Sequence, residues 1–182
     1  MCSYTGGLSL VTHYTNPNSL AATDAAEIAA ATKSVDFAAY SLTEPTVINA
    51  LLASAKAGRT IRLYLDRSEL EAEARGNPAL PNSPLHLLLA VPGITIKVKH
   101  SMILMHLKSY CIDGTTLRDG SANFSTLGES EQDNSVTYTD DTAAVAAFQA
   151  KFESMWARPD NIDVTTAIEQ SASYGHVRPH TR

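Results

Sequence analysis

Residues 106–123 read HLKSYCIDGTTLRDGSAN and contain two pairs of polar residues, each pair at a spacing of two. The first pair, His106 and Lys108, lies in the β-rich run MHLKSYCI (105–112). Residues two apart on a strand point to the same face, so the imidazole and the ammonium are expected side by side. This run therefore predicts a strand that presents a nucleophilic or proton-transferring ring next to a positive charge.

The second pair, Ser121 and Asn123, follows after the chain has turned back through a short returning strand. The Asp113-Gly114 dipeptide is typical of the turn between the two strands. Asp113 has the opposite strand parity to His106, so we interpret it as structural: it ends the strand and holds nearby backbone or a cation. The segment thus brings an imidazole, an ammonium, a hydroxyl and a carboxamide together, which are the groups that attack on a phosphate diester requires.

Strands and helices alternate around this segment, which is the pattern of an α/β domain. Two strand–helix–strand passes imply parallel neighbours joined by right-handed crossovers. Together with the returning pair of strands, they predict a mixed central β-sheet flanked by α-helices on both faces. Tyr40, near the end of its strand, is interpreted as a core residue or as a wall of the cleft. The expected strands are 8–14, 35–42, 60–65, 94–99, 105–112, 116–120 and 134–139, and the expected helices are 19–33, 43–55, 68–75, 143–156 and 160–170.

The pattern H-x-K-x4-D followed by G-S-x-N resembles the signature of the phospholipase D superfamily, and every signature position is filled here. The segments VDFAAYSLT (35–43) and ALLASAKAGRTIRLYLD (50–66) are similar to the first strand–helix–strand of the short nucleases of that family. The resemblance covers approximately residues 8–157. It implies a phospholipase D/nuclease-like fold in a single catalytic domain, residues 1–182, with residues 158–182 as a C-terminal extension.

Most members of that superfamily carry two copies of the motif in one long chain, whereas this chain carries one. It is therefore similar to the single-motif branch, typified by small bacterial endonucleases that dimerise to build one active site. In-line displacement at phosphorus needs a nucleophile on one side and a proton donor on the other. A histidine pKa near ~6.5 allows one imidazole to be neutral while its partner is charged. Two copies of His106 in a two-fold dimer meet this need, which one copy cannot.

The resemblance also implies roles for the other signature residues. Lys108 and Asn123 are expected to hold the non-bridging phosphate oxygens, with the lysine acting as a point charge. Ser121 is expected either to add a hydrogen bond or to support the loop. Asp133 is expected to accept a hydrogen bond from the imidazole, although relatives often carry the longer Glu there, and Glu131 is the rival candidate.

Length and composition agree with one soluble domain and exclude several classes. The 182 residues are 44% hydrophobic and 18% charged, with a net charge of -5. No apolar run approaches the ~18 residues of a membrane span, so no stable membrane association is expected. Residues 74–112 contain no Asp or Glu, which favours an electropositive face for an anionic ligand. The two cysteines, Cys2 and Cys111, do not form a disulfide framework, and the protein is expected to be cytoplasmic, or secreted or periplasmic after removal of a leader.

The sequence predicts a metal-independent phosphodiesterase that hydrolyses nucleic acid, with DNA as the favoured substrate, through a covalent phosphohistidine. No cofactor or metal is expected, because neither H-E-x-x-H nor C-x-x-C occurs. Two alternatives stay open. One is hydrolysis or phosphatidyl transfer on phospholipids, and the other is a non-catalytic module that binds nucleic acid.

Overall fold

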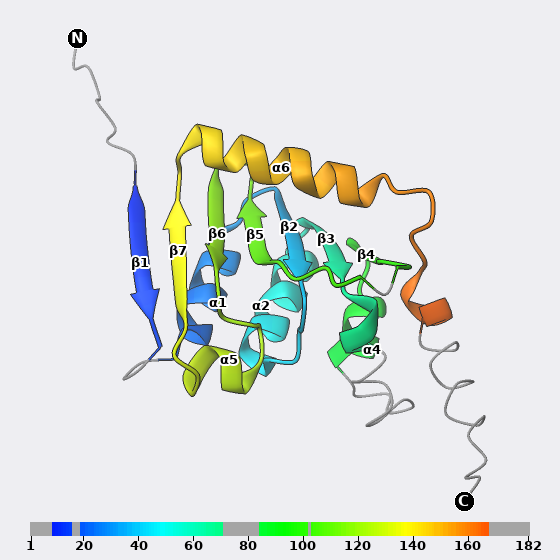
Figure 1. The fold of residues 1–182 in the computed structure, drawn as a ribbon, viewed down its shortest axis with the longest axis horizontal. Coiled ribbons are helices and arrows are strands. Elements are labelled where there is room, and N and C mark those ends of the chain that lie inside the picture. Colours follow the sequence, from blue (N-terminus) through cyan, green and yellow to red (C-terminus); the bar gives the residue numbers. More distant parts are fainter. Residues whose placement is uncertain (1–8, 16–18, 71–83, 102, 168–182) are drawn as a thin grey trace, which may run out of the picture.

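Seven strands form one mixed β-sheet in the computed structural model, which describes residues 9–15, 19–70, 84–101 and 103–167. The strands are β1 (Leu10–Tyr14), β2 (Ser34–Ala39), β3 (Thr60–Leu65), β4 (Ile94–Val98), β5 (Lys108–Ile112), β6 (Thr116–Gly120) and β7 (Ser135–Thr139). Their order in the sheet is β1-β7-β6-β5-β2-β3-β4 (Figure 1). β2, β3 and β4 are parallel neighbours, and the remaining neighbours are antiparallel.

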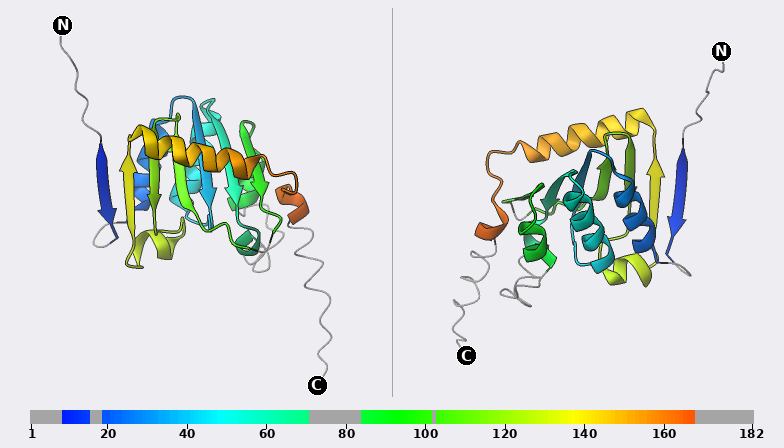
Figure 2. Two further views of the ribbon diagram at one scale, coloured as in Figure 1. Left: turned by 45° about the horizontal axis from the view of Figure 1, so that its top comes forward. Right: turned by 180° about the vertical axis from the view of Figure 1, so that it is seen from behind.

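Helices cover both faces of the sheet (Figure 2). The long α6 (Thr142–Trp156) crosses one face, and α1 (Ala21–Ala30) and α2 (Pro45–Lys56) cover the other. Two shorter helices are α4 (Pro84–Leu89) and α5 (Thr126–Ser130), and residues 67–70 and 164–167 are helical as well. The α/β fold predicted from the sequence, a mixed sheet flanked by helices on both faces, is therefore confirmed.

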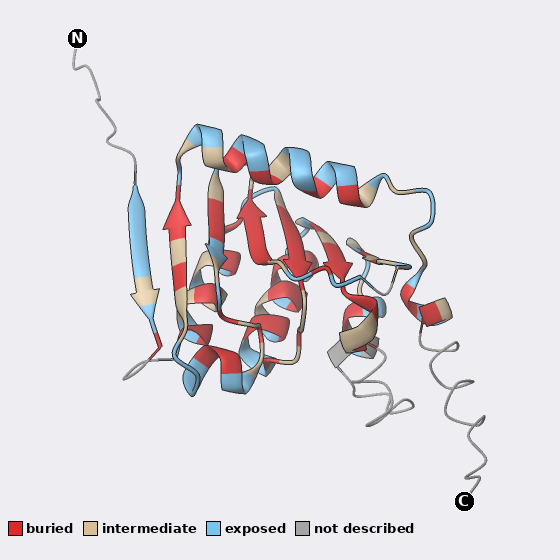
Figure 3. Ribbon diagram, in the orientation of Figure 1, coloured by how far each residue is buried: buried red, intermediate tan, exposed pale blue. Residues whose placement is uncertain are grey.

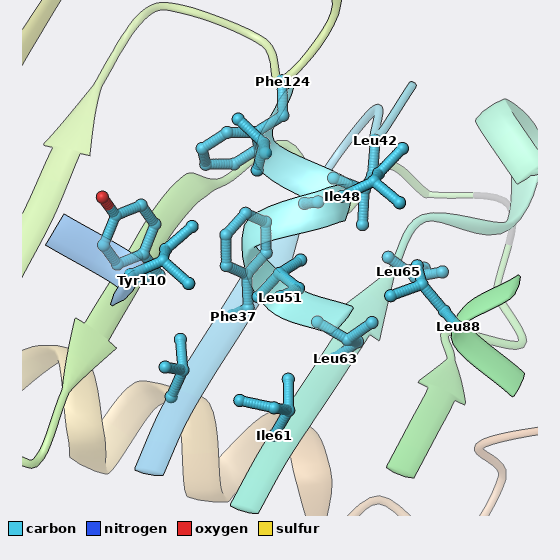
Figure 4. Close-up of a cluster of buried hydrophobic side chains, with 14 of the residues drawn as sticks. Phe37, Leu42, Ile48, Leu51, Ile61, Leu63, Leu65, Leu88, Tyr110 and Phe124 are labelled. Atoms are coloured by element: carbon cyan, nitrogen blue, oxygen red, sulfur yellow. The ribbon is translucent and has the colours of Figure 1, made fainter. Parts of the chain in front are cut away.

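The two sides of the central strands pack into two separate hydrophobic clusters. Phe37 and Tyr110 are fully buried on the α1 and α2 side, where their rings stack at 5.2 Å (Figures 3 and 4). Cys111, one residue further along β5, packs on the opposite side against Phe148 and Phe152 of α6. The alternation of residues 110 and 111 shows that even-numbered residues of β5 face α1 and α2.

The element boundaries differ from the sequence-based expectations at several places. The strand expected from residue 105 begins at Lys108, because the backbone N–H of Met105 donates to the Asp66 carboxylate at 2.6 Å instead of to a neighbouring strand. The short helices α4 and α5 were not predicted, and each has fewer residues than a periodic pattern needs in order to stand out. Parts of the expected helices at 71–75 and 168–170, and residues 168–182 of the C-terminal extension, lie outside the described residues.

Candidate active site

The signature residues meet at one edge of the sheet, the lower edge in Figure 1. β2 and β3 end there, β5 begins there, and β6 arrives there before the G-S-x-N loop. Tyr40, the residue after β2, contacts the first two signature side chains. Its ring centroid is 4.5 Å from that of His106 in an edge-on contact, and the Lys108 ammonium nitrogen is 4.7 Å from the same centroid. His106 and Lys108 therefore reach one common ring, as their spacing predicted.

Lys108 is held in a largely buried position. Its exposed fraction is 6%, and its Nζ donates to the His106 carbonyl oxygen at 3.0 Å. Burial lowers the pKa of the Lys108 ammonium, while the charge of Glu69 acts in the opposite direction. An ammonium ion that is partly removed from water interacts more strongly with an anion than an exposed one does.

His106, in contrast, is exposed to solvent. The chain just before it is fixed by Asp66, whose carboxylate accepts the Met105 N–H at 2.6 Å and the Ser68 N–H at 2.9 Å. Tyr40 is itself held by a hydrogen bond to Glu69, which, more than burial, raises the pKa of the Tyr40 hydroxyl. The imidazole thus projects into solvent from a well-anchored backbone, where a substrate can reach it.

The G-S-x-N loop is built by close backbone contacts. A Cβ at Gly120 would lie 2.2 Å from the Ser135 carbonyl oxygen, so only glycine lets β6 approach β7 there. The Ser121 hydroxyl donates to Asn134 Oδ1 at 2.9 Å and accepts from the Ser135 N–H at 3.1 Å. The hydroxyl thus connects the loop to β7, which favours the loop-supporting role for Ser121.

Arg118 links the backbone of Lys108 to the residue before Asn123. Nη1 of Arg118 donates to the Lys108 carbonyl at 2.5 Å and to the carbonyl of Ala122, the neighbour of Asn123, at 3.2 Å. The Asn123 Oδ1 atom is buried and has no hydrogen-bond partner within the described part of the chain. The structure therefore brings His106, Lys108, Ser121 and Asn123 to one edge.

Asp113 lies at the opposite end of β5, away from this edge. It has a positive φ of 53° and accepts hydrogen bonds from Thr32 N, Thr32 Oγ1, Lys33 N and Ser34 N at 2.7–2.8 Å. These bonds tie the loop before β2 to the turn after β5. The Asp113 carboxylate therefore supports the fold and does not lie beside the His106 imidazole.

The stability of the fold is expected to depend on pH through Asp113. Partial burial alone would raise the pKa of this carboxyl, but the hydrogen bonds from Ser34, Thr32 and Lys33 lower the pKa to about 2. Because the folded pKa lies below the unfolded value of about 3.9, the stabilisation is complete above that value and is lost as the pH falls towards 2. Asp113→Asn should lower the free energy of unfolding by about 1–2 kcal/mol at pH 7. Urea denaturation should show this gap closing between pH 4 and pH 2, and a pH-independent gap would contradict it.

Asp133 and Glu131, the two candidates for orienting the imidazole, are both exposed. Within the described residues, neither side chain makes a hydrogen bond to His106, and Asn134, the next residue along, is the one that bonds Ser121. A carboxylate that does connect to the histidine ring is Glu69, which bonds the Tyr40 hydroxyl, and the Tyr40 ring contacts His106.

Three residues support the site, and only one of them, Tyr40, was singled out from the sequence. Tyr40 was left between core and cleft wall, and Gly128 and Arg118 were not considered. The sequence did contain a signal for Arg118. A turn at 113–114 places Arg118 opposite Tyr110 in the hairpin, on the same face of the sheet as Lys108. A charged residue in register with a core residue indicates a buried ion pair.

Gly128 in α5 is expected to be essential for the shape of the loop. Alanine usually stabilises a helix by about 1 kcal/mol relative to glycine, but a Cβ at Gly128 would lie 2.3 Å from the Asn123 carbonyl oxygen and 2.9 Å from its nitrogen. Gly128→Ala should therefore lower the free energy of unfolding by about 1–3 kcal/mol and shift Asn123. Thermal melting should show the loss. Leu127→Ala, at an exposed neighbouring position, is the matched control and should behave like the wild type.

Two further searches concern metals and membranes. Among the described residues, no three His, Cys, Asp or Glu side chains are grouped so that they could hold a metal ion. Over the same ranges, the helices are too short or too polar for any of them to span a bilayer.

Comparison with known sequences places most of the chain in one family model. The model described as "Cardiolipin synthase, PLD-like domain" matches residues 25–156. Mitochondrial cardiolipin hydrolase from Xenopus laevis is 25% identical over 134 residues, which are 74% of this chain and 60% of the relative. The protein of the same name from Chlamydomonas reinhardtii is 22% identical over 129 residues, which are 71% and 54% of the two chains. The chain therefore matches little more than half the length of these curated relatives.

Solved structures with a similar fold are more evenly matched in length. NucT from Helicobacter pylori superimposes with a TM-score of 0.69 at 19% identity, covering 82% of this chain and 96% of NucT. Nuc, a phospholipase D family member from Salmonella typhimurium, gives a TM-score of 0.71 at 21% identity, covering 86% and 99%. At these identities the likeness shows a common fold.

Proposed function

Because the chain belongs to the phospholipase D superfamily, we propose that it is a metal-independent phosphodiesterase that hydrolyses nucleic acid, with DNA as the favoured substrate. The observation that carries the proposal is that the imidazole of His106 and the largely buried ammonium of Lys108 contact one aromatic ring. A nucleophile beside a desolvated cation is the arrangement that attack on a phosphate diester requires. The G-S-x-N loop, tied to the Lys108 backbone, adds the carboxamide of Asn123.

The reaction would proceed in two displacements at phosphorus. A neutral His106 attacks, a nitrogen–phosphorus bond forms, and the bond from phosphorus to the leaving oxygen breaks. A second, protonated imidazole gives its proton to that oxygen. The same imidazole then removes a proton from water, whose oxygen displaces His106 and releases the phosphate monoester. Lys108 and Asn123 bind the non-bridging oxygens throughout.

The second imidazole would come from His106 of another copy of the chain. The exposed position of His106 at a sheet edge leaves its outer side open to such a neighbour, and a two-fold axis would set the two rings face to face. In this assembly an exposed carboxylate such as Asp133 or Glu131 could orient the imidazole of the other copy. We therefore propose a homodimer with one shared active site.

A phospholipid is the second candidate substrate, and two observations favour it. The relatives named above are cardiolipin hydrolases, and the chain just before His106 exposes two apolar side chains, Ile103 at 78% and Leu104 at 48%. Apolar side chains beside a phosphodiesterase site suit the rim of a lipid-binding cleft. Against this, Lys99 lies on the same connection between β4 and β5 and suits a polyanion.

An activity panel in excess EDTA separates the candidates. The substrates are supercoiled plasmid, single-stranded DNA, RNA, and vesicles of cardiolipin or phosphatidylcholine. Cleavage of nucleic acid, with DNA cut fastest, is the expected result. Cleavage of phospholipid alone would move the assignment to the second candidate. Salt-sensitive DNA retention without any cleavage would indicate a binding module.

The shared site has its own test. Light scattering should give twice the 19.5 kDa mass of the chain. Heterodimers of wild-type and His106→Ala chains should lose nearly all activity, because each shared site would hold one imidazole. Heterodimers with full activity per site would reject the two-histidine scheme.

A further inference from the structure

Arg118 is a fully buried charged residue beneath the candidate active site. Its exposed fraction is 0%, and its guanidinium spans three elements of the fold. Nη1 donates to the carbonyls of Lys108 and Ala122 at 2.5 and 3.2 Å. On the other side, Nε and Nη2 donate to the Asp24 carboxylate of α1 at 3.1 and 3.0 Å.

The two carbonyls need this donor because β5 and β6 separate at the site. The paired residues of these strands are 110–112 with 116–118, so the ladder ends at Tyr110 and Arg118, before Lys108 is reached. On the other side of β5, Tyr40 N donates to the Leu107 carbonyl. Backbone groups of an antiparallel strand alternate in direction, so the Lys108 carbonyl points away from β2 and into the gap left by β6. A buried carbonyl without a donor is costly, and the guanidinium satisfies it.

We propose that Arg118 is a positioning residue that fixes the Lys108 strand and the G-S-x-N loop at a set separation, so that Lys108 and Asn123 can bind one phosphate group together. This inference rests on the proposed phosphodiesterase function and adds a residue to it. Arg118 does not touch the substrate in this scheme. It acts through the two backbones that carry the residues which do.

The guanidinium is held so that it cannot rotate away. The Asp24 carboxylate accepts hydrogen bonds from two of its nitrogens, Nε and Nη2. Glu129 Oε1 lies 3.3 Å from Nη2, and the Phe124 ring centroid lies 4.3 Å from Cζ. A planar, rigid guanidinium suits this task. Its Nε and Nη2 edge binds the carboxylate, while Nη1 binds both carbonyls. A lysine at this position keeps the charge for Asp24 but cannot make all these contacts at once.

The test is Arg118→Lys, with Arg62→Lys as its matched control. Arg62 is also paired with carboxylates, Asp36 and Glu153, both at 2.6 Å, but it lies on the α6 face of β3. Steady-state cleavage of bis(4-nitrophenyl) phosphate is measured for both variants and corrected for the folded fraction from circular dichroism. A displacement of about 1 Å can cost about 100-fold in rate, so we expect Arg118→Lys to lower kcat about 10- to 100-fold with KM changed less than about 3-fold. Arg62→Lys should keep the wild-type kcat.

The outcomes separate the two proposals. An inactive wild-type chain would reject the proposed function and this inference with it. An active wild-type chain with an unchanged kcat in folded Arg118→Lys would reject the inference alone. If Arg118→Lys is unfolded at the assay temperature, the double variant Arg118→Gln/Asp24→Asn takes its place, since it leaves no single charge buried. The same loss of kcat is expected from it, and an unchanged kcat would again overturn the inference.

Discussion

Replacing His106 with asparagine is expected to lower phosphodiesterase kcat by at least ~10⁴-fold, the largest effect expected from any single substitution in this chain. In a site shared by two copies, the change removes both the nucleophile and the proton donor, and losses of this size are typical when such groups are removed. Folding should be unaffected, because His106 is exposed and exposed substitutions usually change stability by less than about 0.5 kcal/mol. Plasmid nicking in EDTA and thermal melting measure the two quantities on the same preparation.

His100→Asn is the matched control for this experiment. His100 is also exposed and lies on the connection between β4 and β5, where its ring Nδ1 is 3.4 Å from the Arg67 guanidinium. It belongs to no signature position, so its activity should stay within a few-fold of the wild type. Equal activities of the two variants would show that the histidine of the motif does not carry the chemistry.

The second large effect concerns stability and distinguishes two buried carboxyls, Asp24 and Glu129. Asp24 Oδ1 accepts the hydroxyls of Tyr110 and Tyr138 at 2.8 and 2.6 Å, and the carboxylate pairs with Arg118. Removing one partner of a buried ion pair costs about 3–5 kcal/mol, so Asp24→Asn should lower the free energy of unfolding by about that amount. Urea denaturation at pH 7 measures it.

Glu129→Gln should instead raise the free energy of unfolding in the same measurement, because at pH 7 the unfolded wild-type chain gains free energy by ionising Glu129 and glutamine cannot ionise. Burial, followed by the charge of Asp24, raises the pKa of the Glu129 carboxyl to about 9, so it is protonated at pH 7 and glutamine replaces a neutral group. Its folded pKa lies above its unfolded value of about 4.3, so the folded state keeps a proton that the unfolded state loses. The contribution of Glu129 to stability is therefore complete below that value and falls as the pH rises towards 9. Glu129→Gln should flatten this slope, and a loss of stability as large as that of Asp24→Asn would show that Glu129 is the charged partner.

The local elements were largely predictable from the sequence. The strand at 60–65 has the predicted bounds, and the helices found at 45–56 and 142–156 differ from those expected by one or two residues at most ends. The parity of β5 was also correct, since Cys111 faces α6 while Lys108 and Tyr110 face the other side. These properties depend on neighbouring residues, and the periods of strands and helices record them directly.

The supporting residues of the site could not be found in the same way. Asp24 and Arg118 are 94 residues apart in sequence, and Gly128 is constrained by the Asn123 backbone only because α5 folds back on the loop. Contacts of this kind depend on how elements pack, and a single sequence carries no period that reports it.

The sequence by itself determined that this chain is an α/β member of one superfamily, and it predicted His106, Lys108, Ser121 and Asn123 as the candidate site, because strand parity and motif spacing are local properties. Only the tertiary structure decided that β5 lies between β2 and β6, that the histidine and the lysine both contact the Tyr40 ring, and that Arg118 bonds the Lys108 carbonyl where β5 and β6 separate. The physical reason is that strand order and buried ion pairs are fixed by the burial of both sheet faces at once. That condition involves residues from the whole chain.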